Sequence, residues 1–62
     1  MSKSDLVDIT CMVKHETKAA WLINDGAKDV WIPKSQCEVE IVGTAAAIAT
    51  MPEWLAHEKG LI

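Results

Sequence analysis

Few residues of this 62-residue sequence have side chains suited to metal binding. The two cysteines and two histidines, Cys11, His15, Cys37 and His57, form a set that could hold a tetrahedral zinc ion. They are separated by 3, 21 and 19 residues, so no Cys-x-x-Cys pair is present. Structural zinc sites usually place their ligands in close pairs. We therefore expect no metal site, but two core cysteines and two exposed histidines.

Two short pairs could do nucleophilic or acid–base chemistry. Lys34 and Ser35 could form a serine–lysine nucleophile, which needs a desolvated lysine and donors for an oxyanion. Nothing in the sequence predicts such a pocket, and both residues lie in a polar corner after Pro33. The His15-Glu16 pair lies in an equally polar stretch. We expect no catalytic residue, no cofactor and no enzymatic activity.

Binding chemistry is better represented in the same corner. The Trp31 indole, the Lys34 ammonium and the Gln36 amide could stack on a nucleic-acid base and hold a phosphate. The charge of the chain argues against nucleic acid as the partner, because nine acidic and six basic residues give a formal net charge of −3. All six basic residues are lysines, and phosphate neutralisation supplies most non-specific affinity. The alternative for Trp31 is a packed position under the helix near Trp54.

Acidic side chains next to this corner suggest another partner. They would form either a solvated face or a negative patch that meets a basic protein surface, such as a groove that normally holds nucleic acid. We take Trp31, Lys34, Gln36, Glu38 and Glu40 as the candidate partner-binding residues. The full acidic set is Asp25, Asp29, Glu38, Glu40, Glu53 and Glu58.

Composition limits the class of protein. Half of the residues are hydrophobic, which argues against a disordered tail, and the length allows one small domain. No apolar run approaches the roughly 20 residues of a membrane span. The segment Met1–Asp5 lacks the layout of a signal peptide, so we expect a cytoplasmic protein without membrane contact. Both cysteines are then expected to be reduced.

Alternation of apolar and polar residues predicts most of the strands. It is clearest in Val7–Val13 and again in Cys37–Ile41, where Glu38 and Glu40 point outward. The alanine-rich run 45–49 is ambiguous between helix and strand, and we favour an edge strand. The expected strands cover about 6–13, 19–23, 28–32, 37–42 and 45–49.

A hairpin is expected around Asp25-Gly26, because Asp-Gly between two apolar runs is a strong turn signal. A two-residue turn pairs Asn24 with Ala27, and therefore Trp21 with Val30. This register places Trp21, Ile23, Val30 and Ile32 on one face, and Leu22, Asp29 and Trp31 on the other. Apolar residues on both faces suggest that the second face is covered by the helix or by a partner.

The last segment predicts a short helix over about 51–59. Thr50 and Glu53 have the spacing of a capping box, and Pro52 is tolerated in a first turn. Trp54, Leu55 and Met51 are expected on one face. Gly60 is placed to end the helix in a left-handed conformation, with Leu61-Ile62 folding back on the core.

These elements predict a mainly β, α+β domain. We expect four or five antiparallel strands, arranged as a meander or small open barrel, followed by a short C-terminal helix. A chain this small, with apolar side chains on both faces of a hairpin and an exposed strand edge, would gain from pairing with a second copy. We therefore expect a homodimer.

Three stretches together resemble a group of small uncharacterised proteins encoded by bacteriophages, prophages and related mobile elements. They are Lys14-His15-Glu16-Thr17-Lys18-Ala19, Val30-Trp31-Ile32-Pro33-Lys34-Ser35-Gln36, and Met51-Pro52-Glu53-Trp54-Leu55-Ala56 with Lys59-Gly60-Leu61. The Trp-Ile-Pro-Lys-Ser-Gln and Pro-Glu-Trp-Leu-Ala motifs are the more specific of these. The resemblance covers residues 12–62 and implies a phage or mobile-element setting within a bacterial host. It brings no catalytic residues.

Small size and a phage setting favour a binding role. We expect a non-enzymatic protein-binding module that inhibits or modulates a host protein complex, for example in defence. The alternative is an accessory protein of phage replication or recombination that binds single-stranded nucleic acid through Trp31 and Lys34.

Overall fold

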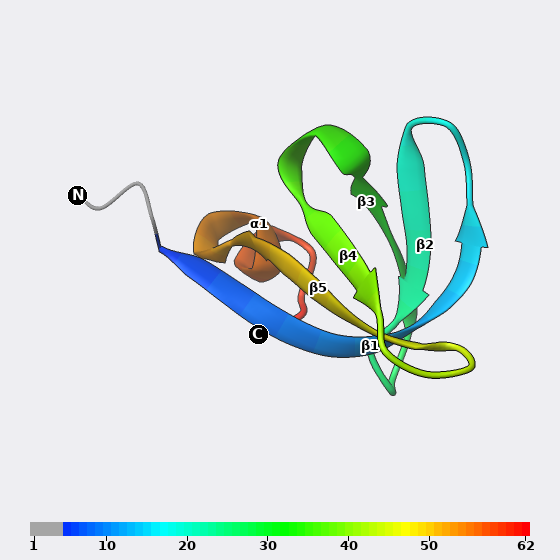
Figure 1. Cartoon of the computed structure of the whole chain (residues 1–62). Helices are drawn as coiled ribbons and strands as arrows, with labels where there is room; N and C mark the ends of the chain where they lie inside the picture. Colours follow the sequence, from blue (N-terminus) through cyan, green and yellow to red (C-terminus); the bar gives the residue numbers. More distant parts are fainter. Residues whose placement is uncertain (1–4) are drawn as a thin grey trace.

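The computed structural model describes residues 5–62 and contains one curled antiparallel sheet with a C-terminal helix (Figure 1). The strand order is β3-β2-β1-β5-β4. The prediction of a mainly β fold with four or five antiparallel strands and a short C-terminal helix is confirmed, with five strands in one open sheet. The segment 1–4, on which the inference about a signal peptide partly rests, lies outside the described residues. The elements are β1 (Leu6–Glu16), β2 (Ala20–Asn24), β3 (Asp29–Pro33), the 3₁₀ helix η1 (Lys34–Gln36), β4 (Glu38–Ile41), β5 (Ala46–Pro52) and α1 (Glu53–Glu58).

The long first strand organises the sheet because its two halves have different partners. Residues 6–12 of β1 pair with β5, and residues 12–16 pair with β2. An extra residue, Lys14, interrupts the register between Val13 and His15, and such bulges bend a strand and increase its twist. Alternation predicted a strand over 6–13, and the bulge lets the same strand continue to Glu16.

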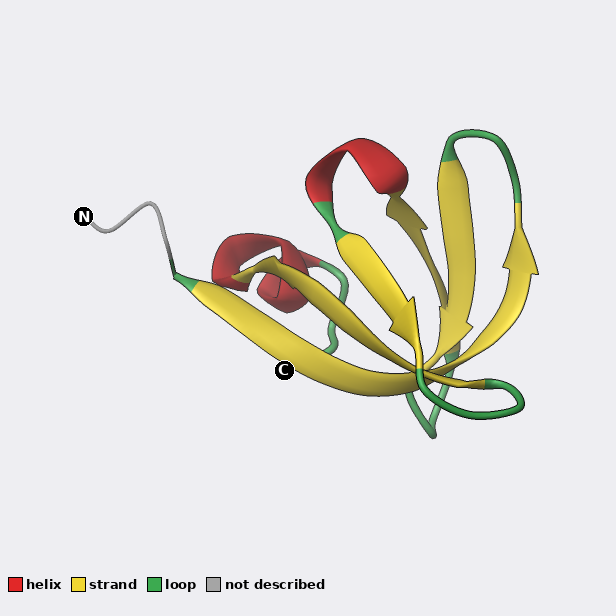
Figure 2. Ribbon diagram, viewed as in Figure 1, coloured by secondary structure: helices red, strands yellow, loops and turns green. Residues whose placement is uncertain are grey.

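The sheet curls so that its two edge strands approach each other at one end (Figure 2). Only residues 34–37 separate β3 from β4, although these strands lie at opposite ends of the strand order. A link of this length spans at most roughly 18 Å. Close approach of the two edges is therefore built into the chain connection.

The β2–β3 hairpin has the predicted faces but not the predicted register. Val30 pairs with Ile23 rather than with Trp21, so the expected register is wrong by two residues. The loop contains four residues, 25–28, because the Asp25 carboxylate accepts hydrogen bonds from the backbone N–H groups of Ala27 and Lys28. A shift of two residues leaves every side chain on its expected face.

The alanine-rich run is an interior strand, and its prediction as an edge strand is wrong. β5 lies between β1 and β4 and pairs with both. The Ala47 and Ala49 side chains are fully buried on the inner face of the sheet. They pack in the same core as Leu55 of α1.

The helix is shorter than expected, and the predicted capping box is wrong. β5 continues to Pro52, which is the residue before the first turn, and no side chain in the described segment 5–62 caps that turn. The Thr50 hydroxyl instead donates to the Asp8 carboxylate at 2.7 Å. The predicted end of the helix is confirmed, since Gly60 has a φ of +75°. There the Leu61 N–H donates to the Ala56 carbonyl at 2.8 Å, as in a Schellman motif.

The core lies on the inner, concave face of the sheet and is closed by the helix. α1 contributes Leu55 and Ala56 and packs against β1 and β5, so it does not cover the outer face that carries Trp31. Leu61 packs against this core, whereas Ile62 is exposed. The buried residues are Ile9, Cys11, Ile23, Val30, Ile32, Ala47, Ala49, Met51, Leu55 and Ala56.

Candidate functional site

The structure places the five predicted binding residues on two surfaces, a groove and the outer face of the sheet, which share only Glu38. Lys34, Gln36 and Glu38 line a groove beside η1, whereas Trp31 is not among the residues that line it. Trp31 and Glu40 have side chains on the outer face of the sheet, on opposite edge strands. The sequence identified exposed residues here, but not that the fold separates them.

The Lys34 side chain is held by contacts within the chain. Its ammonium forms an ion pair with Glu16 and lies 4.9 Å from the centre of the Trp21 ring. The backbone N–H of Lys34 donates to the Ala19 carbonyl at 2.8 Å, which fixes the corner after β3. Lys34 thus joins Trp21 rather than Trp31, and the predicted stacking pair for a nucleotide is not assembled.

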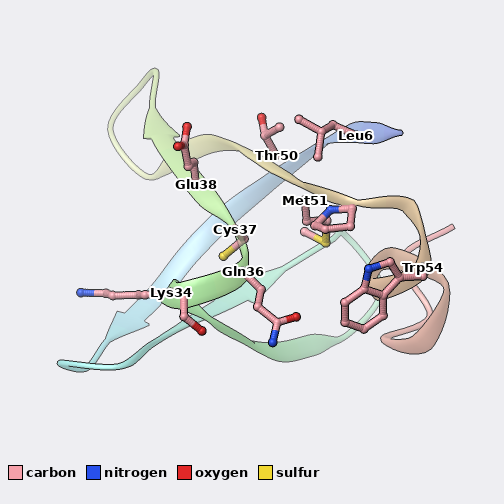
Figure 3. A pocket seen from close by; sticks show the side chains of 10 residues that line it. Leu6, Lys34, Gln36, Cys37, Glu38, Thr50, Met51 and Trp54 are labelled. Carbon is pink, nitrogen blue, oxygen red and sulfur yellow. The ribbon is translucent and has the colours of Figure 1, made fainter. Parts of the chain in front are cut away.

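The groove opens where β4 and β5 stop pairing (Figure 3). The β4–β5 ladder includes Glu38 and Thr50, after which β5 runs on to Pro52 while the chain before β4 turns into η1. Its volume is about 600 Å³, which is within the usual range for ligand pockets. The lining residues are Leu6, Lys34, Ser35, Gln36, Cys37, Glu38, Thr50, Met51, Pro52 and Trp54.

Trp54 is the groove residue that the sequence placed wrongly. Trp54 was expected on one face with Leu55 and Met51, but its side chain is 56% exposed while those of Leu55 and Met51 are buried. A helix of six residues is too short for its periodicity to separate adjacent positions. Leu6, from the start of β1, borders the same groove and gave no signal in the sequence.

A row of three side chains crosses the outer face of β1, β2 and β3. His15 pairs with Leu22, and Leu22 pairs with Trp31, so the three lie side by side on one face. The His15 and Trp31 rings meet edge to face, with centroids 6.2 Å apart. Trp31 is 45% exposed, and Met12, earlier on the outer face of β1, is 50% exposed. We call His15, Leu22, Trp31 and Met12 the aromatic patch.

An acidic group occupies the outer face at the other side of the sheet. Asp8 on β1 pairs with Thr50 on β5, and Thr50 pairs with Glu38 on β4, while Glu40 follows two residues later on the same face. Among residues 5–62, no ion pair engages Asp8, Glu38 or Glu40. We call Asp8, Glu38 and Glu40 the acidic patch. Asp8 belongs to it because the strand order places β5 between β1 and β4.

The cysteines and histidines lie in different parts of the fold. Cys11 is buried, Cys37 is half-buried beside the groove, and burial raises the pKa of both thiols. The Cys37 thiol donates to the Pro33 carbonyl at 3.1 Å. On the helix, Nε2 of His57 lies 3.8 Å from Oε2 of Glu53. Within residues 5–62, no three His, Cys, Asp or Glu side chains gather as a set able to hold a metal ion.

Comparisons with protein-family models, curated proteins and solved structures give no match for this chain. The resemblance to small phage proteins therefore rests on the sequence stretches alone. In the described part of the chain, no helix combines the length and apolar character needed to span a bilayer.

Proposed function

We propose that this chain is a non-enzymatic binding module of bacteriophage or prophage origin that binds a basic surface of a bacterial host protein in the cytoplasm. The observation that carries the proposal is the acidic patch, whose three carboxylates have no cationic partner among residues 5–62. Complementary charge on a partner would speed association and select against acidic surfaces. The exposed rings and side chains of the aromatic patch supply the apolar contact area that charge alone lacks.

Inhibition or modulation of a host complex is the form of binding that we favour. A groove that normally holds nucleic acid has the basic charge that the acidic patch would match. Binding there would block access without any chemistry by this chain. The alternative, direct binding of single-stranded nucleic acid, has lost its main structural support because Lys34 contacts Glu16 and Trp21.

The test begins with capture of host proteins from a bacterial lysate, with and without nuclease, by the tagged chain. A stoichiometric protein that survives nuclease is then purified and titrated against single variants. Glu38→Lys and Glu40→Lys should each weaken binding by roughly three- to thirtyfold at low salt, as expected for reversal of an exposed charge that faces an opposite charge. The loss should shrink at high salt.

Glu58→Lys is the matched control, because it makes the same change in net charge on the helix, away from the outer face. If Glu58→Lys weakens binding as much as Glu38→Lys and Glu40→Lys, only net charge matters and the acidic patch is not the site. If capture disappears with nuclease, the nucleic-acid alternative replaces the proposal.

The homodimer remains a separate proposal, and the aromatic patch is the surface that could form it. Trp31 and Met12 are both about half exposed there, and burial of such side chains drives association. Sedimentation of the wild-type chain and of Trp31→Ala tests this proposal. A dimer that becomes monomeric in Trp31→Ala supports it, and a wild-type monomer at high micromolar concentration refutes it.

A further inference from the structure

The free edge of β4 combines an unpaired backbone with exposed apolar side chains. β4 is the last strand in the sheet order, so one side of its backbone pairs with β5, and the other side pairs with no strand among residues 5–62. The large apolar side chains of Ile41 and Val42, at the end of this edge, are 52% and 55% exposed. An edge with free backbone groups is a template for pairing with another chain.

The side chains of β4 alternate strictly in character. Glu38 and Glu40 pair with Thr50 and Ile48 on the outer face, whereas Val39 and Ile41 belong to the opposite face. Residues directly opposite each other on neighbouring strands have Cβ atoms about 4.5–5.5 Å apart and interact. An added strand would therefore place every second side chain beside a glutamate and the others beside Val39 and Ile41.

This pattern disfavours a second copy of the chain as the added strand. Antiparallel pairing of two β4 strands would bring four glutamates together on one face, and like charges opposite each other are destabilising. The other edge, β3, is less suited to pairing because its last residue is Pro33, which has no N–H to donate. Charge complementarity thus selects β4 as the docking edge and a basic strand as its occupant.

We propose that the β4 edge accepts an extended segment of a basic protein as a sixth strand, and that basic residues alternate with apolar residues along this segment. The inference rests on the proposed function and specifies how the partner is recognised. Backbone hydrogen bonds to β4 supply affinity, as in other cases of strand addition. Glu38 and Glu40 read the basic positions, and Ile41 gains an apolar neighbour.

Synthetic peptides test the proposal on the intact protein. The probe is an acetylated and amidated Lys-Val-Lys-Val-Lys peptide, titrated up to millimolar concentration and followed by NMR of the backbone amides. The block peptide Lys-Lys-Lys-Val-Val has the same composition and charge. We expect the alternating peptide to shift the amide signals of 38–41 and to slow hydrogen exchange at Val39 and Ile41, whose N–H groups face away from β5. It should bind at least roughly fivefold more tightly than the block peptide.

Two N-methylated forms of the alternating peptide separate strand pairing from charge attraction. One is methylated on its lysine amides and the other on its valine amides, so that only one of them blocks the N–H groups that face β4. One form should bind roughly tenfold more weakly, the effect of losing two backbone hydrogen bonds, and the other should bind nearly as well as the parent.

The proposal is overturned if both methylated forms, or the block peptide, bind as tightly as the alternating peptide. It is also overturned if no peptide binds or if binding leaves residues 38–41 unchanged. In these cases the proposed function still stands if Glu38→Lys and Glu40→Lys weaken binding of the captured host protein and Glu58→Lys does not. If Glu58→Lys weakens this binding as much as the other two substitutions, the proposed function is refuted.

Discussion

Replacement of Gly60 by alanine tests how the chain ends the helix. Gly60 has a φ of +75°, which is unfavourable for residues with a Cβ by roughly 1–2 kcal/mol. A Cβ built there would lie 3.1 Å from Lys28 Nζ and 3.3 Å from Lys28 Cε. That contact is relieved if the lysine moves, with loss of the 2.7 Å hydrogen bond from its ammonium to the Gly60 carbonyl.

Gly43→Ala is the matched control. Gly43 does not have the left-handed φ, and among the described residues its added Cβ would meet the Ala46 Cβ alone, at an ordinary distance of 3.4 Å. Both variants reduce the entropy of the unfolded chain in the same way, so that contribution cancels in the comparison. Gly60→Ala should therefore be less stable than Gly43→Ala by about 1–2 kcal/mol.

This difference is large for a domain of 62 residues, whose total stability is expected to be about 3–9 kcal/mol. It should separate the two melting temperatures by about 4 °C or more, measured by circular dichroism. Repeating Gly60→Ala in a Lys28→Ala background isolates the contact with the lysine. Equal stability of Gly60→Ala and Gly43→Ala in both backgrounds would show that the helix does not end in the left-handed turn.

Three further results are expected. Trp31→Ala should cost about 1–2 kcal/mol of folding free energy, since the ring is half exposed. Leu55→Ala, which removes a buried side chain, should cost about 2–5 kcal/mol. Urea midpoints measure both losses, and equal losses would contradict the outer-face position of Trp31. The backbone N–H groups of Ala27 and Lys28 lower the pKa of Asp25. The Asp25 carboxylate therefore stabilises the fold at pH values above its pKa in the unfolded chain. This stabilisation is lost as pH falls through its lower pKa in the folded chain. Urea titrations from about pH 5 to about pH 2 should show a smaller loss for Asp25→Asn than for the wild type, and parallel profiles would exclude the loop contact as the cause. Because burial raises the pKa of both thiols, their alkylation near pH 8 should be slower than in the unfolded chain. Cys37, beside the groove, should react before the buried Cys11. The Cys37→Ser variant shows which of the two rates belongs to Cys37.

Local patterns in the sequence predicted the parts of the fold that depend on neighbouring residues. Alternation placed Glu38 and Glu40 outward and put Trp31 on the face opposite Ile32, because side-chain parity survives a shift of two residues. The left-handed Gly60 was equally predictable, since its position after the helix is enough. In these cases, segments of a few residues contain all the information that decides the result.

Features that depend on distant residues were not predictable. The sequence does not show that β5 lies beside β1, yet this pairing brings Asp8 to Glu38 and makes an alanine-rich strand part of the core. Lys34 is paired with Glu16, 18 residues earlier, and this contact removes the lysine from its predicted role beside Trp31. The hairpin register failed for a different reason, since the side chain of Asp25 sets the loop length.

The exposed apolar side chains indicate how one partner could engage several surfaces. Ile41 and Val42 lie at the β4 edge, Met12 and Trp31 lie in the aromatic patch, and Leu6 and Trp54 border the groove. A small domain that leaves these side chains exposed forgoes burial that would stabilise it, which is expected where binding contributes to selection.

Glu38 connects two of these surfaces, because it lines the groove and begins the β4 edge. Trp31 lies on the opposite edge strand. A partner strand confined to β4 should therefore respond to Glu38→Lys and ignore Trp31→Ala. A partner whose binding is weakened by both substitutions must extend across the outer face of the sheet. The coupling free energy between the two substitutions, measured in the double variant, would show whether one rigid surface of the partner makes both contacts.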